Sequence, residues 1–425
     1  MLKTIKNIKE IILILLVTFS ITTFAQQVPE STAKTIEQAY TKLLKNKKGV
    51  GFSMAIVHKG EIVYAKGFGY ADKENEIKAN ENTVYRIGSI TKSFTSLAIM
   101  QLQEKGKLNV NQSLLDFIPE LKIQNRFNEE KPFLIGDVLS HLSGLPSDVY
   151  NGFVASNPPN TEWLIEELNK QTTISPSKYK DAYSNVGYHL LGEVIARASN
   201  TSYNEYVNEH IFKPLQMNSS FIKYDDKLTK NYAKAYINGD KFEEPLLRDE
   251  AAGMIHSTVL DMANYVKMLL KNGSFKDHKL ISSIEQMTIN RMKNTILVDN
   301  INEGYGYGLT VKNIEIIKNG KTISARSIGH NGNTFGYASD FSFIPELDLG
   351  VVVLTNSDTG KLIRSANRLL KLYAKHSLKQ DIEFNKNPIK IEANLNEKSC
   401  SKDEIKGIYN FAGMMLKINE ANKIK

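Results

Sequence analysis

The spacing of apolar residues changes twice along the chain, and this limits the folds that the chain can form. Near the N-terminus, two apolar segments separated by Lys59-Gly60 predict a β-hairpin over 51–58 and 61–69. The residues that follow have mainly helical spacing. From about residue 303 the spacing returns to the two-residue period of strands, which we predict at 305–311, 322–328, 337–344 and 349–356. Strands at both ends predict one sheet built from both termini, with a helical subdomain at about 106–300.

The helical spacing also predicts where the helices lie. We expect helices at 31–48, from residue 89 to about 105, at 163–168, in two segments between 186 and 214, at 254–270 and at 360–374. A sheet packed against a helical subdomain leaves a cleft between them, and small-molecule sites are usually found in such clefts.

The first 25 residues have the composition of a secretory signal peptide. Lysines at positions 3, 6 and 9 precede an apolar run over 11–17, and Thr23-Phe24-Ala25 offers a small-x-small cleavage site. The apolar run is short for a membrane span. We therefore expect residues 1–25 to direct export, to the periplasm or as a secreted protein. The alternative is an uncleaved anchor, in which case this segment would contact the membrane.

Charge and cysteine content exclude several classes of function. The formal net charge is +8, but no block of five or more basic residues occurs, so we expect no nucleic-acid partner. Cys400 is the only cysteine, so this chain has no internal disulfide. No Cys/His cluster has the spacing of zinc ligands, so we expect no metal site.

One of the five Ser-x-x-Lys sequences in the chain stands at the start of a long helical pattern. Ser89 and Lys92 are nearly one helical turn apart, so their side chains lie on the same face. A serine hydroxyl becomes a good nucleophile when a neighbouring base takes its proton. A desolvated lysine can be that base, because desolvation lowers its pKa. The competing interpretation is a capping serine followed by a lysine whose ammonium reaches solvent.

Two further motifs have residue types that would complete such a site. The run Tyr183-Ser184-Asn185 precedes a helical segment, and His330-Asn331-Gly332 stands at the end of a predicted strand. Tyr183 and Lys92 can exchange protons with Ser89, and Asn185 can orient a substrate amide or the lysine. Gly332 has no side chain, so a substrate can lie against that strand. The backbone N–H groups of Ser89 and Asn333 can then stabilise an oxyanion, beside a polar wall formed by His330.

Several of these residues also have a purely structural interpretation. Tyr183 can be a core tyrosine with a satisfied hydroxyl, Asn185 a helix cap and His330 a turn residue. His141 is expected to brace its loop and is not assigned to the site. Tyr-x-Asn and His-x-Gly also occur elsewhere in the chain, so the order and context of the three motifs support the site.

These motifs resemble those of the serine β-lactamase-like and penicillin-binding-protein-like hydrolases. The resemblance covers about residues 31–375, in the branch that holds class C β-lactamases, D-alanyl-D-alanine carboxypeptidases, esterases and D-aminopeptidases. Further similar stretches lie at 139–146, 212–217, 252–254, 304–308 and 329–337. The resemblance implies an α+β fold of the β-lactamase/transpeptidase-like type, an α/β sandwich. In that fold a five-stranded antiparallel sheet is flanked by helices and accompanied by an all-helical subdomain.

The resemblance also implies a reaction without metal or cofactor, in which a serine is acylated and the acyl-enzyme is hydrolysed. By position, Ser89 would be the nucleophile, Lys92 and Tyr183 the general acid/base pair, and Asn185 a substrate contact. The amides of Ser89 and Asn333 would form the oxyanion hole. The expected partner is a small-molecule or peptide substrate, including substrates derived from peptidoglycan.

One motif departs from the family pattern. Class C β-lactamases and many carboxypeptidases have Lys-Thr-Gly where this chain has His330-Asn331-Gly332. A neutral histidine lacks the fixed charge with which lysine holds a substrate carboxylate. The histidine form resembles the esterase and peptidase members more closely, so the sequence argues against strong β-lactamase activity. Ester, D-amino-acid peptide and β-lactam substrates all remain open.

Other functions are compatible with parts of the sequence. A non-catalytic or slow-turnover module that binds peptidoglycan or a β-lactam would have the same motifs. An α/β-hydrolase would need a nucleophile elbow, and the nearest match, Gly51-Phe52-Ser53-Met54-Ala55, lies inside a predicted hairpin strand.

The predicted organisation has three parts. Residues 1–25 are the signal peptide, and residues 26–375 form the hydrolase domain. Residues 376–425 form a linker and a short C-terminal extension, which resembles the start of a small β domain that is incomplete here.

Overall fold

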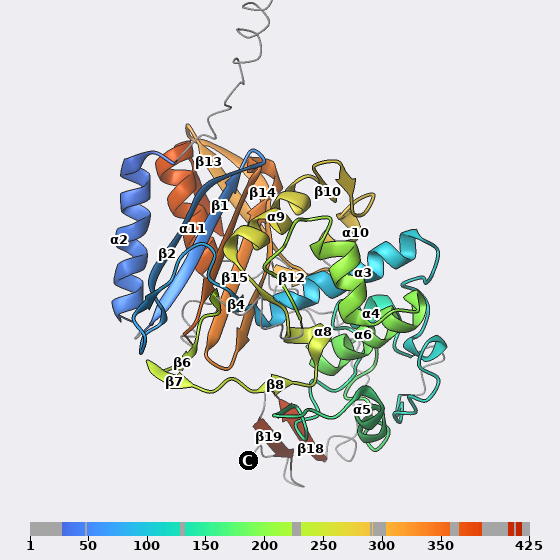
Figure 1. Cartoon of the computed structure of the whole chain (residues 1–425). Coiled ribbons are helices and arrows are strands. Elements are labelled where there is room, and N and C mark those ends of the chain that lie inside the picture. Colours follow the sequence, from blue (N-terminus) through green and yellow to red (C-terminus); the bar gives the residue numbers. More distant parts are fainter. Residues whose placement is uncertain are drawn as a thin grey trace, which may run out of the picture. The chain divides into compact units, whose positions relative to one another are not determined.

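The computed structural model contains the predicted sheet, with strands from both ends of the chain side by side (Figure 1). β1 (Gly51–His58) and β2 (Glu61–Asp72) form the N-terminal hairpin. β1 also pairs antiparallel with β16 (Leu349–Thr355), from Phe52 opposite Thr355 to His58 opposite Leu349. This pairing joins the two ends of the domain, as the sequence predicts.

The sheet is wider than the five strands implied by the family resemblance. Its order is β12-β13-β14-β15-β16-β1-β2-β3, and β17 also pairs with β13. The remaining bounds are β3 (Ile77–Lys78), β12 (Glu303–Tyr305), β13 (Thr310–Lys318), β14 (Lys321–Thr334), β15 (Tyr337–Ile344) and β17 (Asp381–Phe384). The extra width is at the edges, where β12 pairs with the start of β13 and β17 with its middle. All neighbouring strands in this sheet pair antiparallel.

The structure describes residues 28–46, 49–127, 132–222, 231–289, 291, 303–357, 365–384, 407–411 and 414–418. Those up to 388 belong to one unit, and those from 389 onward belong to a second. In the second unit, β18 (Gly407–Phe411) and β19 (Met414–Ile418) form an antiparallel pair. The predicted signal peptide and Cys400 lie outside the described residues.

Both faces of the sheet are covered by helices, so the central strands are buried along their whole length. On one face, Phe52, Met54 and Ile56 of β1 pack in a cluster with α2 (Glu30–Asn46) and α11 (Ser365–Tyr373). On the other face, Ala55 and Val57 pack in a cluster with α9 (Val259–Leu270). Alternate side chains of a strand point to opposite faces, so one strand serves both clusters. Figure 1 shows α2 and α11 together on one side of the sheet.

The helical subdomain is centred on α3, which packs against α6 and α8. Figure 1 shows α3 to α6 grouped on the side of the sheet away from α2. The helix bounds are α3 (Thr91–Glu104), α4 (Ile135–Leu139), α5 (Thr161–Leu168), α6 (Asn185–Ser199), α7 (Tyr203–Val207), α8 (Glu250–Gly253) and α10 (Glu285–Thr288). Among the described residues, no helix is long and apolar enough to cross a membrane.

Short elements connect these parts. Single turns lie at η1 (Gly88–Ile90), η2 (Leu114–Asp116), η3 (Asn208–Phe212), η6 (Pro345–Leu347) and η7 (Ala374–Leu378). Short strands lie at β4 (Tyr85–Arg86), β5 (Val154–Ala155), β6 (Ala235–Ile237), β7 (Asp240–Phe242), β8 (Leu246–Leu247), β9 (His256–Ser257), β10 (Ser274–Phe275) and β11 (His278–Lys279).

Three predicted elements begin or end elsewhere. The strand expected at 322–328 continues to Thr334 as β14. The helix expected at 254–270 starts at Val259, because Thr258 is its N-cap and β9 before it pairs with β4. The strand expected at 305–311 is two strands, β12 and β13, separated by a turn. Gly308 in that turn has φ of +69°, and a Cβ there would lie 2.7 Å from the carbonyl oxygen of Lys92. The turn thus packs against the start of α3, which a continuous strand could not do.

Candidate active site

Ser89 lies in η1, the 3-10 turn directly before α3, and not in the first turn of the α-helix as the sequence suggested. The tighter turn begins at Gly88, whose φ of +51° is a conformation that glycine adopts readily. Gly88 also allows β14 to come close, since a Cβ there would lie 3.1 Å from the backbone nitrogen of Asn333. The N–H of Thr91 donates to the carbonyls of Gly88 and Ser89, so the turn continues into α3.

Lys92 is fully buried, and its side chain reaches back to Ser89. Its Nζ lies 3.1 Å from Ser89 Oγ, 2.7 Å from Asn185 Oδ1 and 2.9 Å from the carbonyl oxygen of Ala252. The last two atoms can only accept hydrogen bonds. A neutral amine has two N–H bonds, and these two acceptors can take both. Its lone pair is then left for the hydroxyl of Ser89, so Lys92 can accept the Ser89 proton.

The protonation of Lys92 fits this role. Burial lowers the pKa of Lys92 to about 7, although the charges of Asp148 and Asp249 raise it. None of its three hydrogen-bond acceptors is a carboxylate. A substantial fraction of the lysine is therefore neutral at pH 7, which is the form that acts as a base.

Tyr183 approaches the same serine from the loop before α6. The residue is 40% exposed, and Lys92 Nζ lies 4.8 Å from its ring centroid. Desolvation raises the pKa of Tyr183 above its usual value, while a hydrogen bond with Ser89 opposes this increase. The phenol is therefore protonated at neutral pH and can donate a proton.

His141 braces its loop, as expected, and it also supports Tyr183. Its Nδ1 accepts a hydrogen bond from the backbone N–H of Ser184 at 3.1 Å, and its ring centroid lies 4.2 Å from that of Tyr183. The backbone N–H of Ala182 donates to the His141 carbonyl at 2.8 Å. Burial holds the pKa of His141 well below its usual value, so the ring is neutral. The histidine therefore fixes the turn that carries Tyr183 into the site.

Asn185 is the first residue of α6, and its side chain is available because Ser184 caps the helix instead. Ser184 Oγ accepts from the Gly187 N–H at 2.9 Å. Asn185 Nδ2 donates to Asp148 Oδ1 at 2.8 Å, and this fixes its amide so that Oδ1 faces Lys92. The second oxygen of Asp148 accepts from Ser147 Oγ at 2.6 Å. Hydrogen bonds therefore connect Ser89 to Asp148 through Lys92 and Asn185.

Gly332 and Asn333 bring β14 against the serine turn. A Cβ on Gly332 would lie 2.1 Å from the carbonyl oxygen of Ile87 and 2.9 Å from the backbone nitrogen of Ser89, so only glycine fits there. Ser339 Oγ, on the neighbouring strand β15, donates to the Ile87 carbonyl at 2.6 Å. The strand is thus fixed to η1, and the backbone nitrogens of Ser89 and Asn333 both lie at this junction.

His330 is the predicted site residue whose surroundings differ most from expectation. It is 6% exposed, lies within β14 and not at its end, and does not line the cavity beside Ser89. Its Nδ1 donates to its neighbour's carbonyl, that of Asn331, at 2.6 Å, and its Nε2 accepts from the Tyr305 hydroxyl at 2.8 Å. Burial lowers its pKa to about 3, helped by the charge of Lys92. Both ring nitrogens are therefore occupied, and the ring is neutral at physiological pH.

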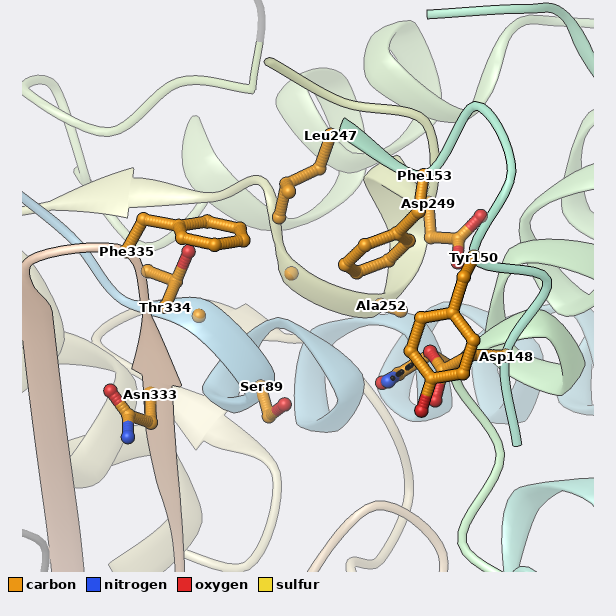
Figure 2. Close-up of a pocket in the computed structure, with 13 residues that line it drawn as sticks. Ser89, Asp148, Tyr150, Phe153, Leu247, Asp249, Ala252, Asn333, Thr334 and Phe335 are labelled. Atoms are coloured by element: carbon orange, nitrogen blue, oxygen red, sulfur yellow. Dashed lines mark hydrogen bonds between the residues drawn. The ribbon is translucent and has the colours of Figure 1, made fainter. Parts of the chain in front are cut away.

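A cavity of about 370 Å³ opens above Ser89. It is lined by Gly88, Ser89, Asp148, Tyr150, Phe153, Asn185, Leu247, Asp249, Ala252, Gly253, Asn333, Thr334 and Phe335. Figure 2 shows Ser89 between two groups, with Asn333, Thr334 and Phe335 on one side and Asp148 and Tyr150 on the other. Leu247 and Phe153 lie across from the serine. No group of three or more His, Cys, Asp or Glu in the described part of the chain is placed to hold a metal ion.

The structure thus brings Ser89, Lys92, Tyr183, Asn185, Gly332 and Asn333 together, with His330 close behind them. Sequence reasoning missed Asp148, whose position two residues after the stretch 139–146 was the available signal. It also missed the Ala252 carbonyl, for which no side chain could give a signal. The aromatic residues of the cavity, Tyr150, Phe153 and Phe335, lie outside helices and strands, where the sequence has no regular pattern.

Comparisons with known proteins agree with this geometry. The family model described as Beta-lactamase matches residues 36–375. The chain belongs to the beta-lactamase family. This match includes the serine turn, the Tyr183 loop and β14. The family is one of serine hydrolases that also includes penicillin-binding-protein-like members.

Individual relatives are similar over parts of their length. "Beta-lactamase-like protein 2" of Dictyostelium discoideum is 34% identical over 250 residues, which are 56% of this chain and 45% of that protein. "Protein flp" of Staphylococcus aureus strain MW2 is 29% identical over 340 residues, which are 77% of this chain and 64% of that protein. The chain thus spans about half to two thirds of these relatives.

A solved structure is also similar over most of its length. It is that of the octameric penicillin-binding protein homologue from Pyrococcus abyssi, with 30% identity and a TM-score of 0.66. The similarity covers 82% of this chain and 81% of that one.

Proposed function

We propose that this protein is an exported serine hydrolase that works through an acyl-enzyme on Ser89. The observation that carries the proposal is the buried Lys92, which makes no ion pair with the residues that the structure describes. Its Nζ lies 3.1 Å from Ser89 Oγ, and burial lowers its pKa to about 7. The substrate has an ester, amide or lactam carbonyl. Export rests on the sequence of residues 1–25 alone.

The proposed reaction has two halves. Lys92 takes the hydroxyl proton of Ser89 while Oγ forms a bond to the carbonyl carbon, and the carbonyl oxygen becomes an oxyanion held by the amides of Ser89 and Asn333. The tetrahedral intermediate then breaks its bond to the leaving group, which receives a proton from Tyr183, and Lys92 passes the serine proton to Tyr183, so that both groups return to their starting forms. A water molecule repeats the addition on the acyl-enzyme, and the acid product leaves with Ser89 restored.

The neutral charge of His330 supports a preference for substrates without a carboxylate. A substrate carboxylate needs a cationic or donor group to hold it, and His330 is neutral with both ring nitrogens occupied. We therefore infer that neutral esters and amides are better substrates than penicillins or peptides with a free C-terminal carboxylate.

The test is modification of Ser89 by a fluorophosphonate probe, together with rates on a panel of esters, D-amino-acid peptides and a cephalosporin. We expect one adduct, on Ser89, in the intact mass and in fragmented peptides. Ser89→Ala should remove the adduct and lower hydrolysis by about 10⁴-fold or more. Its unfolding free energy should change by less than about 1 kcal/mol.

A matched control is Ser93→Ala, four positions along the chain. The Ser93 hydroxyl donates to the Ile90 carbonyl at 2.8 Å and does not line the cavity. This variant should keep the adduct and the rate. A folded wild-type protein that forms no adduct and hydrolyses nothing would contradict the proposal, and a stable adduct with a β-lactam but no turnover would favour a binding module.

A further inference from the structure

The charges around the cavity are unequal, and this bears on which substrates it accepts. Among the described residues, two carboxylates line the cavity, those of Asp148 and Asp249, and no Lys or Arg does. Asp249 is 1% exposed and is neutralised by Arg248, whose Nε and Nη2 lie 2.8 and 3.2 Å from its two oxygens. Arg248 is itself held by the carbonyls of Val149 and Asn151 at 3.0 Å. Asp249 therefore has a structural role in the cavity wall, because its charge is already paired with Arg248.

Asp148 is different because its charge is not balanced. Its carboxylate accepts hydrogen bonds from Asn185 Nδ2 and Ser147 Oγ, which are both neutral groups. Within the described part of the chain, no Lys, Arg or His nitrogen makes an ion pair with it. The cation nearest to it in the hydrogen-bond chain is Lys92, which is occupied by its own acceptors. Asp148 is partly exposed to the cavity and retains lone pairs for a further donor.

The residues beside Asp148 would also accommodate a cation. Tyr150 is 68% exposed and lines the same cavity, and Figure 2 shows it on the same side of Ser89 as Asp148. An aromatic face attracts an ammonium group, and the effect adds to the attraction of a carboxylate. At the same time, the described residues that line the cavity include no cationic side chain that would pair with a substrate carboxylate, and His330 lies outside this lining.

We propose that the active site selects substrates with an ammonium group a few bonds from the scissile carbonyl, such as aminoacyl esters or amides, and that Asp148 is the counter-ion. This inference rests on the proposed function at Ser89 and names its substrate class. The ammonium group would lie between the Asp148 carboxylate and the Tyr150 ring. An added carboxylate at the same place would meet a like charge.

The experiment compares three forms of one substrate that differ only at the amine. These are alanine p-nitroanilide, its N-acetyl form and its N-succinyl form, each as both enantiomers, with the corresponding methyl esters as a second series. We expect kcat/KM to fall from the free amine to the acetyl form and to fall again with the succinyl carboxylate. The preference should weaken as salt is added, because the charge that causes it is partly exposed.

Asp148→Asn is the decisive variant because it keeps the shape and an oxygen for Asn185. It should lower the ratio of kcat/KM for the amine over the acetyl form by about 10- to 100-fold, the value of a hydrogen-bonded charge. Asp148→Glu should restore part of the ratio. The control is Asp116→Asn, which removes one exposed carboxylate outside the cavity and should leave the ratio unchanged.

The outcomes separate this inference from the proposed function. If wild type hydrolyses the acetyl form through Ser89 as fast as the amine, or if Asp148→Asn leaves the ratio unchanged, the substrate class is wrong while the serine hydrolase stands. If no substrate is hydrolysed and Ser89 takes no fluorophosphonate, the proposed function itself has failed.

Discussion

Arg86, in β4, and Lys92, in the first turn of α3, are both fully buried basic side chains, but the groups that surround them differ in charge. Arg86 Nε lies 2.8 Å from Glu244 Oε1, and its other nitrogens donate to the Pro245 carbonyl. Burial raises the pKa of Glu244, but a hydrogen bond with His256 and the charge of Arg86 lower it to about 2. The pair is therefore ionised. Lys92 has three hydrogen-bonded neighbours and no carboxylate among them.

The difference shows how one fold can use two buried basic residues in different ways. The Arg86 ion pair stabilises the structure, whereas Lys92 takes part in proton transfer. A buried cation with a carboxylate stays charged, and it anchors the segment that follows Glu244, which leads to Ala252 in the cavity wall. A buried amine that has only neutral acceptors loses its proton more easily, because burial favours the neutral form. The Arg86 pair therefore holds the wall in place, while Lys92 can take up and release a proton. Changing the partners should exchange these properties.

The largest effect on activity should come from replacing Lys92, which is the proposed base. Lys92→Met keeps the length of the side chain and removes the base, so we expect kcat/KM to fall by about 10²- to 10⁴-fold. Tyr183→Phe should also lose most of the rate, because the phenol could then no longer pass a proton to the leaving group. The double variant should lose little more than the worse single variant, since residues that act as one unit are not additive. Steady-state rates on an ester measure all three, and additive losses would mean that the two residues do not share a proton path.

Removing the Glu244 carboxylate, which pairs with Arg86, should lower the stability of the protein more than its hydrolysis rate. Glu244→Gln leaves the charge of Arg86 buried without a counter-ion, so we expect the unfolding free energy to fall by about 3–5 kcal/mol. Urea denaturation of the two proteins at pH 7 measures this loss. Arg86→Met with Glu244→Gln removes both charges and is the control, which should be more stable than Glu244→Gln alone.

The same pair predicts how stability depends on pH. The pKa of Glu244 is lower in the folded protein, so its contribution is complete above the usual carboxyl pKa of about 4.5 and is lost as the pH falls towards about 2. Wild type should therefore lose more stability than Glu244→Gln between these two values. Equal acid curves for the two proteins would show that the ion pair adds nothing to stability.

The fold was predictable where the spacing of apolar residues defines a strand and where neighbouring strands in the sequence pair with each other. The β1–β2 hairpin and the strands β15 and β16 are short apolar stretches that end at turn residues, and their predicted positions agree with the structure. The division of 305–311 into two strands was not predictable, because the turn at Gly308 depends on its close packing against the backbone of Lys92. That contact lies between segments far apart in the sequence. Whether glycine marks a turn or a strand is decided by such packing.

The site was predictable in its side chains and less so in its electrostatics. Ser89, Lys92, Tyr183 and Asn185 have functional groups that a motif can reveal, and the structure brings them together. The lowered pKa of Lys92 depends on burial and on the Ala252 carbonyl, neither of which a motif records. Similarly, the sequence predicts that His330 forms a polar wall of the site, but the Tyr305 hydroxyl donates to its Nε2 and so occupies that nitrogen.

The smallest predicted effect is also the most direct test of the comparison, because it gives Lys92 the kind of partner that Arg86 has. The double variant Asp148→Asn with Asn185→Asp exchanges an amide and a carboxylate that are 2.8 Å apart. The two groups can still form a hydrogen bond, and the total charge is unchanged. The new carboxylate would lie where Asn185 Oδ1 now lies, 2.7 Å from Lys92 Nζ.

In wild type, kcat/KM should rise with pH through about 7 as Lys92 loses its proton, since only the neutral amine is a base. A carboxylate in contact favours the protonated form, so the exchange should move this rise upward by about 1–3 pH units. The rate at pH 7 should accordingly fall by about 10-fold or more. Asp148→Asn alone should move the rise downward, because the charge of Asp148 raises the pKa of Lys92 in the wild type. Shifts of opposite sign would identify the titrating group as Lys92, whereas a rise that stays in place in both variants would assign it to another residue.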